Sequence, residues 1–255
     1  KQLNKFIEVG YQDYAKYRSD PSKEASSQLS PYFHSGQIST HEVFDKISEL
    51  ESWSPESINP KMVGRREGWW GSSENFESFM DELITWRELG YHTCVRRANY
   101  NQYSSLPEWA LKTLHEHSSD EREHIYTLDE LTYSQTHDEI WNAAQNQLRT
   151  QGVIQNYLRM LWGKKILEWT PNPQIALSYM ITLNDRYSLD GRDPNSYSGV
   201  FWILGRYDRA WGPERSIFGK IRYMTSDSTA RKFNLKPYLE QWGNESLGII
   251  TSISK

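Results

Sequence analysis

Apolar side chains recur every three to four residues along most of this chain, and this pattern predicts helices almost from end to end. A helix repeats its faces at that interval, whereas a half-buried strand needs strict alternation of apolar and polar residues. No stretch alternates for long enough to propose a sheet, and the 255 residues suffice to bury a core. We therefore predict an all-α fold, formed by a single domain over residues 1–255.

Capping patterns predict where several of these helices begin and end. Ser39 and Glu42 have the spacing of a capping box, which predicts a helix start, and Thr136 and Glu139 repeat that spacing. Gly152 predicts the end of the helix that follows Thr136, because glycine readily adopts the left-handed conformation that closes a helix.

Two polar stretches, 51–73 and 187–197, contain proline and glycine and are predicted to be loops. Between them, residues 153–169 have a strongly helical pattern, and Pro173 opens a further helix. The turn at 190–195 carries acidic residues, but their spacing does not fit the calcium-loop template. We therefore expect a structural turn there.

Charge and metal-ligand content narrow the function classes. A net charge of −4 argues against a uniformly basic surface for nucleic acid. A local basic groove remains compatible, because phosphate charge acts over only ~8–10 Å. Cys94 is the single cysteine, which excludes an internal disulfide and a cysteine-based zinc site. His115, His117, His124 and His137 lack the helical spacing of a metal-binding pair, so we expect no metal.

Targeting and nucleotide-binding signals are missing from the sequence. No apolar run approaches the roughly 20 residues of a transmembrane helix, and the N-terminus lacks the apolar core of a signal peptide. The chain also lacks a glycine-rich phosphate loop and a nucleophile elbow. We expect no membrane partner and a cytoplasmic location, or a nuclear one if the source is eukaryotic.

Tryptophan is abundant, with 11 residues, and its spacing carries information. Trp162 and Trp169 are seven residues apart, so on one helix they share a face at a separation of ~10 Å. Trp141, on the preceding helix, would lie between them. The pattern fits a packed aromatic seam, which geometry alone favours, and it also fits an electron-hopping chain. Met160 would point to the opposite side of the helix, so this helix would separate a ligand pocket from the aromatic seam.

A second candidate pocket lies on the stripe that Phe76, Phe79 and Leu83 predict. Glu82 and Trp86 form an i, i+4 pair beside that stripe. A carboxylate next to a tryptophan is unusual in a core, and it suits a pocket that stacks a flat group and hydrogen-bonds to its edge.

Four stretches resemble class II DNA photolyases of the photolyase/cryptochrome family. These stretches are 29–39, 158–169, 183–195 and 217–224, and the likeness covers nearly the whole chain and is weakest at 51–73. The resemblance implies a photolyase/cryptochrome-type helical FAD-binding catalytic domain. It also implies that the family's N-terminal α/β antenna domain is absent from this chain, either missing or carried separately.

The resemblance assigns residues to an FAD site. For the diphosphate, the matching residues are Tyr14, Ser26, Ser27, Gln28, Leu29 and Ser30. Beside the flavin ring, the matching residues are Arg159, Asn184, Asp190, Asp193 and Asp208. Arg159 and Asp190 match an ion pair, and Asn184 matches a side chain that faces flavin N5. Hydroxyls and backbone N–H groups suit the diphosphate, and an amide can accept a hydrogen bond from the N5–H of a reduced flavin.

The resemblance also assigns a substrate pocket and a relay. The pocket residues that would hold a flipped-out pyrimidine dimer are Gln28, Glu82, Trp86, Met160 and Trp202. The relay residues, from proximal to distal, are Trp162, Trp141 and Trp169. Together with Glu82 and Asn184, the relay tryptophans form the implied catalytic set. Gln28 departs from the asparagine that is usual in class II, and Leu161 departs from the usual tyrosine.

The implied function is light-driven repair of cyclobutane pyrimidine dimers by a deoxyribodipyrimidine photo-lyase, through electron transfer from excited reduced FAD to damaged DNA. Two alternatives stay open. One is a cryptochrome-like blue-light photosensor without repair activity. The other is a flavoprotein or DNA-binding module whose missing domain supplies the function. The presence of the pocket residues favours repair.

Overall fold

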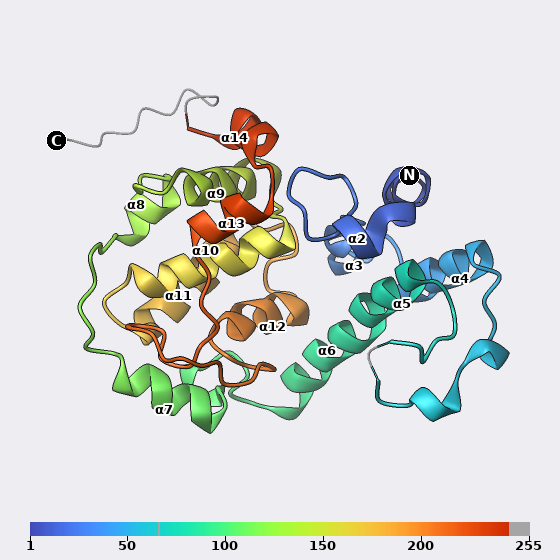
Figure 1. Cartoon of the computed structure of the whole chain (residues 1–255), viewed down its shortest axis with the longest axis horizontal. Helices are drawn as coiled ribbons and strands as arrows, with labels where there is room; N and C mark the ends of the chain where they lie inside the picture. The colour runs from blue at the N-terminus through green and yellow to red at the C-terminus, as the bar shows by residue number, and fades with distance from the viewer. Residues whose placement is uncertain (66, 245–255) are drawn as a thin grey trace. The chain divides into compact units, whose positions relative to one another are not determined.

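The computed structural model describes residues 1–65 and 67–244, and within these residues it contains helices and turns but no strand (Figure 1). The one pairing of β type in this part is an isolated bridge between Arg215 and Gly219. The all-α prediction is confirmed. The chain packs as two compact units, Lys1–Thr93 and Cys94–Lys255. The prediction of one domain over 1–255 stays a prediction, and its last residues, 245–255, lie outside the described part.

The first unit is built from short helices. In chain order they are α1 (Gln2–Lys5), η1 (Phe6–Gly10), η2 (Tyr11–Asp13), α2 (Tyr14–Tyr17), α3 (Ser30–His34), α4 (Thr40–Leu50), η3 (Pro55–Ser57), η4 (Pro60–Met62), α5 (Glu74–Met80), η5 (Asp81–Trp86) and α6 (Arg87–Arg96), the last of which continues past the unit boundary. The core of this unit is aromatic: the ring of Phe79 lies 5.1 Å from that of Phe6 and 5.2 Å from that of Tyr14. This contact packs α5 against the N-terminal helices.

The predicted start of α4 is confirmed, since the Ser39 hydroxyl accepts a hydrogen bond from the backbone N–H of Glu42. Val43 and Ile47 on its apolar face are fully buried, whereas Leu50 in the last turn is 44% exposed. The predicted loop at 51–73 contains only the short turns η3 and η4 in its described residues.

The second unit is organised around one buried helix. In chain order its elements are η6 (Tyr103–Ser105), α7 (Glu108–Glu116), α8 (Leu128–Thr132), α9 (Glu139–Gln151), α10 (Asn156–Glu168), α11 (Pro173–Tyr187), α12 (Pro194–Ile203), α13 (Ser226–Lys232) and α14 (Lys236–Trp242). Helix α10 packs against α9, α11 and α12, and Figure 1 shows it in yellow among them. A helix with apolar residues all around is expected to be buried in this way. Gly163 permits the approach of α12, because a Cβ atom there would lie 2.1 Å from Cδ1 of Ile203.

The start of α9 differs from the prediction. Its cap is Asp138, whose carboxylate accepts from the N–H of Trp141 at 3.0 Å, and not Thr136. The Thr136 hydroxyl is buried and donates to Oδ1 of Asn142 at 2.8 Å, so it does not cap the helix. The predicted end at Gly152 is confirmed, with a left-handed φ of 71°.

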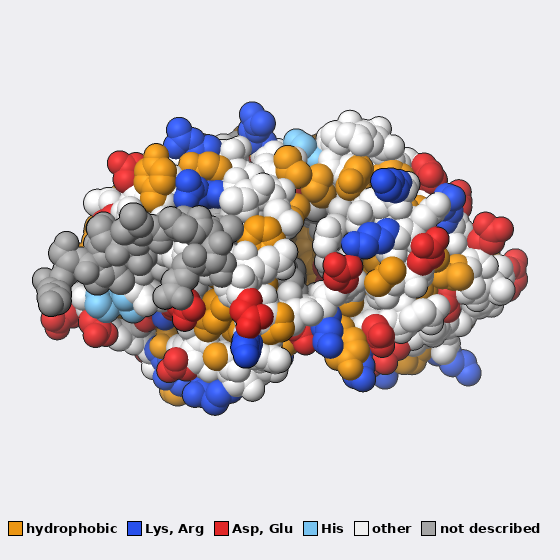
Figure 2. Space-filling model, turned by 90° about the horizontal axis from the view of Figure 1, so that it is seen from above, with side chains coloured by type: hydrophobic (Ala, Val, Ile, Leu, Met, Phe, Trp, Pro, Cys, Tyr) orange, Lys and Arg blue, Asp and Glu red, His pale blue; other side chains and the backbone are white. Residues whose placement is uncertain are grey.

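Helix α10 begins a few residues later than expected. The Gln155 side chain caps it by accepting from the N–H of Tyr157 at 2.7 Å. In the described part of the chain, no helix is both long and apolar enough to cross a membrane. On the face shown in Figure 2, acidic and basic side chains are interspersed, in keeping with the small net charge.

Candidate functional site

The three tryptophans at 141, 162 and 169 lie together in the second unit. Each is at most 2% exposed. Nε1 of Trp141 donates to the carbonyl oxygen of Trp162 at 3.0 Å, and the rings of Trp141 and Trp169 meet edge to face with centroids 5.7 Å apart. Nε1 of Trp162 donates to Oε1 of Gln145 at 2.8 Å. Trp141 therefore contacts both partners, and the indole N–H groups of Trp141 and Trp162 are fixed by hydrogen bonds.

Polar aromatic side chains surround Trp169. The ring centroids of Tyr126 and His137 lie 5.5 Å and 5.2 Å from its centroid, and Nζ of Lys165 lies 5.3 Å from it. Burial, followed by the neighbouring His124, lowers the pKa of His137, so its neutral ring can accept from the Tyr126 hydroxyl at 2.7 Å. A cavity of about 440 Å³ is bordered by His124, His137, Lys165 and Trp169, but not by Tyr126. Sequence reasoning considered His124 and His137 only as metal ligands and missed this arrangement.

A polar network joins α10 to α11 and α12. Nη1 of Arg159 donates to Oδ1 of Asn184 at 2.7 Å, and Nδ2 of Asn184 donates to the hydroxyl of Ser196. Nη2 of Arg159 lies 3.9 Å from Oδ1 of Asp190, which also accepts from the Ser188 hydroxyl. Asn184 is 3% exposed, so its amide is held in one orientation. The sequence suggested Arg159, Asn184 and Asp190 but gave no signal for Ser196.

Asp193 and Asp208, the other expected flavin-pocket residues, hold local turns. Asp193 caps α12 and accepts from the N–H of Asn195 at 2.9 Å. Asp208 accepts from the N–H of Arg209 at 2.8 Å and from Nε1 of Trp211 at 3.1 Å.

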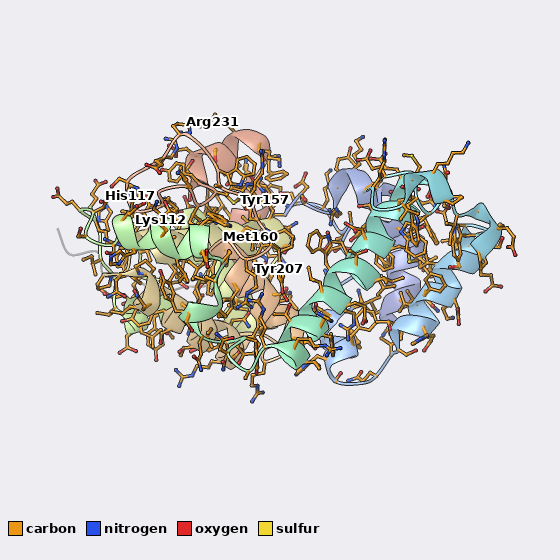
Figure 3. All side chains as sticks on the ribbon, turned by 90° about the horizontal axis from the view of Figure 1, so that it is seen from below. Lys112, His117, Tyr157, Met160, Tyr207 and Arg231 are labelled. Carbon is orange, nitrogen blue, oxygen red and sulfur yellow. The ribbon has the colours of Figure 1, made fainter. Side chains whose placement is uncertain are left out.

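The expected pocket residues of the second unit are both half-buried. Met160 lies on α10 and Trp202 near the end of α12. The Trp202 ring meets the ring of Tyr207 edge to face at 5.9 Å, and Figure 3 labels Met160 and Tyr207 on this unit.

Lys164 is a buried lysine, whereas the basic pair Lys164–Lys165 is typical of a solvated face. It is 2% exposed, and its Nζ donates to the carbonyl oxygen of Ile203 at the end of α12. Burial lowers the pKa of Lys164 to about 7, against the opposing influence of the Asp208 charge. This hydrogen bond fastens the end of α12 to α10.

In the first unit, Glu82 is paired with Arg18, whose Nη1 donates to Oε1 of Glu82. The Arg18 guanidinium also lies 5.8 Å from the ring centroid of Tyr14 and hydrogen-bonds to its hydroxyl. Burial raises the pKa of Tyr14, so the hydroxyl stays protonated. Burial alone would lower the pKa of Arg18, but the charges of Glu82 and Tyr14 and the hydrogen bonds to both together outweigh it, and the pKa rises. Sequence reasoning missed Arg18.

The expected pairing of Glu82 with Trp86 is altered by local backbone geometry. Residues of η5 form a π-helical turn, in which side chains five residues apart align. Nε1 of Trp86 therefore donates to Oδ2 of Asp81 at 2.9 Å, while Glu82 turns to Arg18. Both Glu82 and Trp86 remain half-buried.

Residues 26–30, which were expected to bind the FAD diphosphate, form a turn that leads into α3. Gln28 has a left-handed φ of 52°, Leu29 is 1% exposed, and the carbonyl of Ser27 accepts from Nε2 of Gln2 at 3.0 Å. Among the described residues, no acceptor bonds to the backbone N–H groups of Ser26 to Ser30 or to the hydroxyls of Ser26 and Ser27. The turn therefore carries several hydrogen-bond donors without a partner in the described structure.

No family model matches the chain. Two curated relatives are similar over most of it. It is 41% identical over 239 residues to the deoxyribodipyrimidine photo-lyase of Methanothermobacter thermautotrophicus, covering 94% of this chain and 48% of the relative. It is 40% identical over 236 residues to the deoxyribodipyrimidine photo-lyase of Oryza sativa subsp. japonica, covering 92% and 43%. The chain thus spans slightly less than half the length of these relatives.

Solved structures show the same fold. The bacterial class III photolyase from Agrobacterium tumefaciens superposes with a TM-score of 0.67 at 18% identity, covering 94% of this chain and 43% of that one. An archaeal photolyase from Sulfolobus tokodaii, solved with two FAD molecules, gives a TM-score of 0.57 at 15% identity, covering 98% and 48%. The predicted type of helical fold is confirmed.

Proposed function

Because the chain belongs to the photolyase/cryptochrome family, we propose that it is the FAD-binding catalytic part of a class II-like photolyase that repairs cyclobutane pyrimidine dimers in DNA. The observation that carries this proposal is the arrangement around α10. One helix supplies Arg159 to a buried polar network and Trp162 to a buried aromatic seam. The curated relatives with about 40% identity are named photo-lyases, which favours repair over a purely sensory role.

The donors of the chain fit an FAD molecule. In the first unit, the N–H groups of Ser26 to Ser30 and the hydroxyls of Ser26 and Ser27 suit a diphosphate, since successive backbone N–H groups form anion-binding concavities. In the second unit, the Arg159–Asn184 network offers a guanidinium and an amide to a polar ring edge. When bound, reduced FAD would supply the electron that light transfers to the dimer.

Arg159 and Ser196 together orient Asn184. Oδ1 of Asn184 accepts from Arg159, and its Nδ2 donates to Ser196, so the amide cannot rotate without losing both bonds. An amide oxygen has two lone pairs, so Oδ1 can still accept from an N–H donor. We assign Asn184 to facing flavin N5 on this basis. Asp190 would balance the charge of Arg159.

The seam of Trp162, Trp141 and Trp169 would act as the relay that returns the flavin to its reduced state. Their rings are excluded from water and locked by packing, which fixes the distances that electron transfer depends on. The Gln145 side chain holds the N–H of Trp162, and the Trp162 carbonyl holds that of Trp141.

Four half-buried side chains and the exposed Gln28 would hold the flipped dimer. Trp86 and Trp202 would stack on its bases, Glu82 would hydrogen-bond to a pyrimidine edge, and Met160 and Gln28 would line the site. A damaged pair costs less to flip than intact bases, because its stacking and pairing are already weakened.

A repair assay tests the proposal. Purified protein is supplied with FAD, reduced, mixed with an oligonucleotide that contains one thymine dimer, and irradiated with blue light. We expect dimers to disappear in the light and to persist in the dark, as measured by chromatography. Flavin that photoreduces without dimer binding or repair would establish the photosensor instead. Repair that occurs only after an α/β domain is added would support the other alternative, a module whose missing domain supplies the function.

A further inference from the structure

Tyr207, which Figure 3 labels, lies in a tight turn directly after α12. The N–H of Asp208 donates to the carbonyl of Gly205 at 3.2 Å, so Tyr207 is the third residue of this turn. The N–H of Gly205 donates in turn to the carbonyl of Trp202 at 3.0 Å. These backbone hydrogen bonds fasten the turn to the end of the helix and fix the position of Tyr207 relative to Trp202.

The backbone of Tyr207 has an unfavourable conformation. Its φ is 65°, in the left-handed region, where the Cβ atom of an L-residue crowds the backbone. A positive φ at the third position of a turn normally selects glycine or asparagine. A bulky tyrosine there lowers the stability of the fold, and residues in such conformations cluster at ligand-binding sites. We therefore expect the side chain of Tyr207 to have a role that offsets this strain.

The ring of Tyr207 packs on the ring of Trp202. The two rings meet edge to face, with centroids 5.9 Å apart and planes at 71°. Aromatic pairs favour this geometry, because the positive edge of one ring meets the negative face of the other. Both side chains are half-buried. The Tyr207 ring thus limits the orientations of an indole that the core does not enclose.

Arg206 anchors Tyr207 from the interior of the unit. Arg206 is 5% exposed, its Nη2 donates to the carbonyl of Tyr100 at 2.7 Å, and its Cζ lies 3.8 Å from the ring centroid of Phe201. The same guanidinium hydrogen-bonds to the Tyr207 hydroxyl. Because Arg206 is itself held by packing and hydrogen bonds, both ends of the Tyr207 side chain are fixed.

We propose that Tyr207 is a positioning residue, which holds the Trp202 ring in the orientation that stacks on a base of the flipped dimer. This wall of the pocket is then formed before DNA binds, and binding does not have to order the indole. The inference rests on the proposed function, because it takes Trp202 to stack on the dimer.

The test is a double-mutant cycle on the affinity of FAD-loaded protein for a duplex with one thymine dimer, measured in the dark by fluorescence anisotropy. Tyr207→Asn removes the ring, and asparagine tolerates the left-handed backbone, so the turn should keep its shape. This variant should bind roughly twofold to twelvefold more weakly, the change expected for one edge-to-face pair. In protein that carries Trp202→Ala, the same change should have no further effect, because the ring to be positioned is gone.

Two further variants make the result specific. Tyr207→Phe keeps the ring and loses only the hydroxyl, so it should recover most of the affinity that Tyr207→Asn loses. Tyr100→Leu is the matched control and should bind like wild type. It removes another half-buried ring of the same unit, which meets the ring of Tyr197 edge to face at 5.1 Å, and it keeps the backbone carbonyl that binds Arg206.

The outcomes separate the inference from the function. If Tyr207→Asn weakens binding by the same factor with and without Trp202→Ala, Tyr207 does not act through Trp202, and the proposal is overturned. Unchanged affinity in Tyr207→Asn overturns it as well. If Tyr207→Asn does not fold, Tyr207→Gly replaces it in the cycle, because glycine adopts a left-handed φ most readily.

Failure of the proposed function has a different signature. If wild type binds dimer-containing and undamaged duplexes equally, the proposed function fails, and the inference fails with it. If wild type prefers the dimer but Trp202→Ala does not weaken binding, only the inference fails.

Discussion

The chain uses tryptophan in two contrasting settings. Trp141, Trp162 and Trp169 are at most 2% exposed, and they contact one another through rings or backbone. Trp86 and Trp202, each in its own unit, are half-buried, and each has one ring edge held by a polar or aromatic neighbour. We call the three buried tryptophans the closed seam and the two half-buried tryptophans the open group.

This difference in burial predicts a difference in role. A buried indole with its N–H bonded cannot accept a ligand, but its distance to the next ring is constant, which suits electron transfer. A half-buried indole exposes part of its ring to solvent, which suits stacking on a base. Substitutions in the two groups should therefore impair different steps.

The largest effect is expected from Trp162→Phe in the closed seam. It should remove most of the photoreduction rate of oxidised FAD, because phenylalanine is much harder to oxidise than tryptophan. Repair by enzyme reduced beforehand in the dark should be nearly unchanged. Flash-induced absorbance measures the first quantity, and dimer loss measures the second.

Trp109→Phe is the matched control, since Trp109 lies on α7 of the same unit and outside the seam. It should leave both rates intact. Equal loss of photoreduction and repair in Trp162→Phe would contradict the relay, and it would mean that the indole supports the fold or the flavin site.

The closed seam shows how far the sequence could predict the structure. The seven-residue spacing of Trp162 and Trp169 and the preceding position of Trp141 suggested their proximity, because helical periodicity is local. Gly152 and Ser39 marked helix boundaries correctly for the same reason. The motif resemblance added the pairing of Arg159 with Asp190, which no local rule supplies. It did not predict the hydrogen bond that Arg159 donates to Asn184.

The surroundings of Glu82 and Trp86 show where prediction from the sequence failed. Arg18 and Glu82 are 64 residues apart, and only tertiary packing brings them together. The π-helical turn inserts one residue into the helical repeat, so the partner of Trp86 is Asp81 rather than Glu82. At α9, a nearby aspartate caps the helix in place of Thr136, whose hydroxyl had a buried partner that the sequence could not reveal.

A smaller effect is expected from Trp202→Ala in the open group. Loss of one stacked base should weaken binding of dimer-containing DNA by ~1–3 kcal/mol, or roughly 5- to 150-fold in affinity. Photoreduction should be unchanged, because the seam is intact. Fluorescence anisotropy with a labelled duplex measures the affinity.

Trp109→Ala serves as its control, since it removes a half-buried tryptophan from outside the pocket. Its affinity for the same duplex should match that of wild type. Unchanged affinity in Trp202→Ala would show that Trp202 does not bind the dimer. Slower photoreduction in this variant would show that the two groups of tryptophans do not have separate roles.

The smallest effect concerns Lys164, which links the helix of Trp162 to the helix of Trp202 within the second unit. It lies two residues after Trp162 on α10, and its Nζ holds the carbonyl of Ile203, the neighbour of Trp202. Because burial lowers the pKa of Lys164 to about 7, the folded state releases this proton at a pH where the unfolded chain still binds it. The free energy of unfolding should therefore rise with pH above about 7, by up to ~1.4 kcal/mol per pH unit. The gain is lost when the pH falls below about 7.

Lys164→Met should abolish this rise, because methionine fills a similar volume without a titrating group. Urea unfolding at pH 7, 8 and 9 measures the free energy, and the difference between wild type and variant removes contributions from other groups. Lys112→Met is the control, since the Lys112 side chain is 77% exposed on α7 and should follow wild type at every pH. Parallel curves for wild type and Lys164→Met would show that Lys164 keeps its ordinary pKa. Lys164 would then form its hydrogen bond to α12 as a buried charge, with the full desolvation penalty. The contact between α10 and α12 would in that case destabilise the unit.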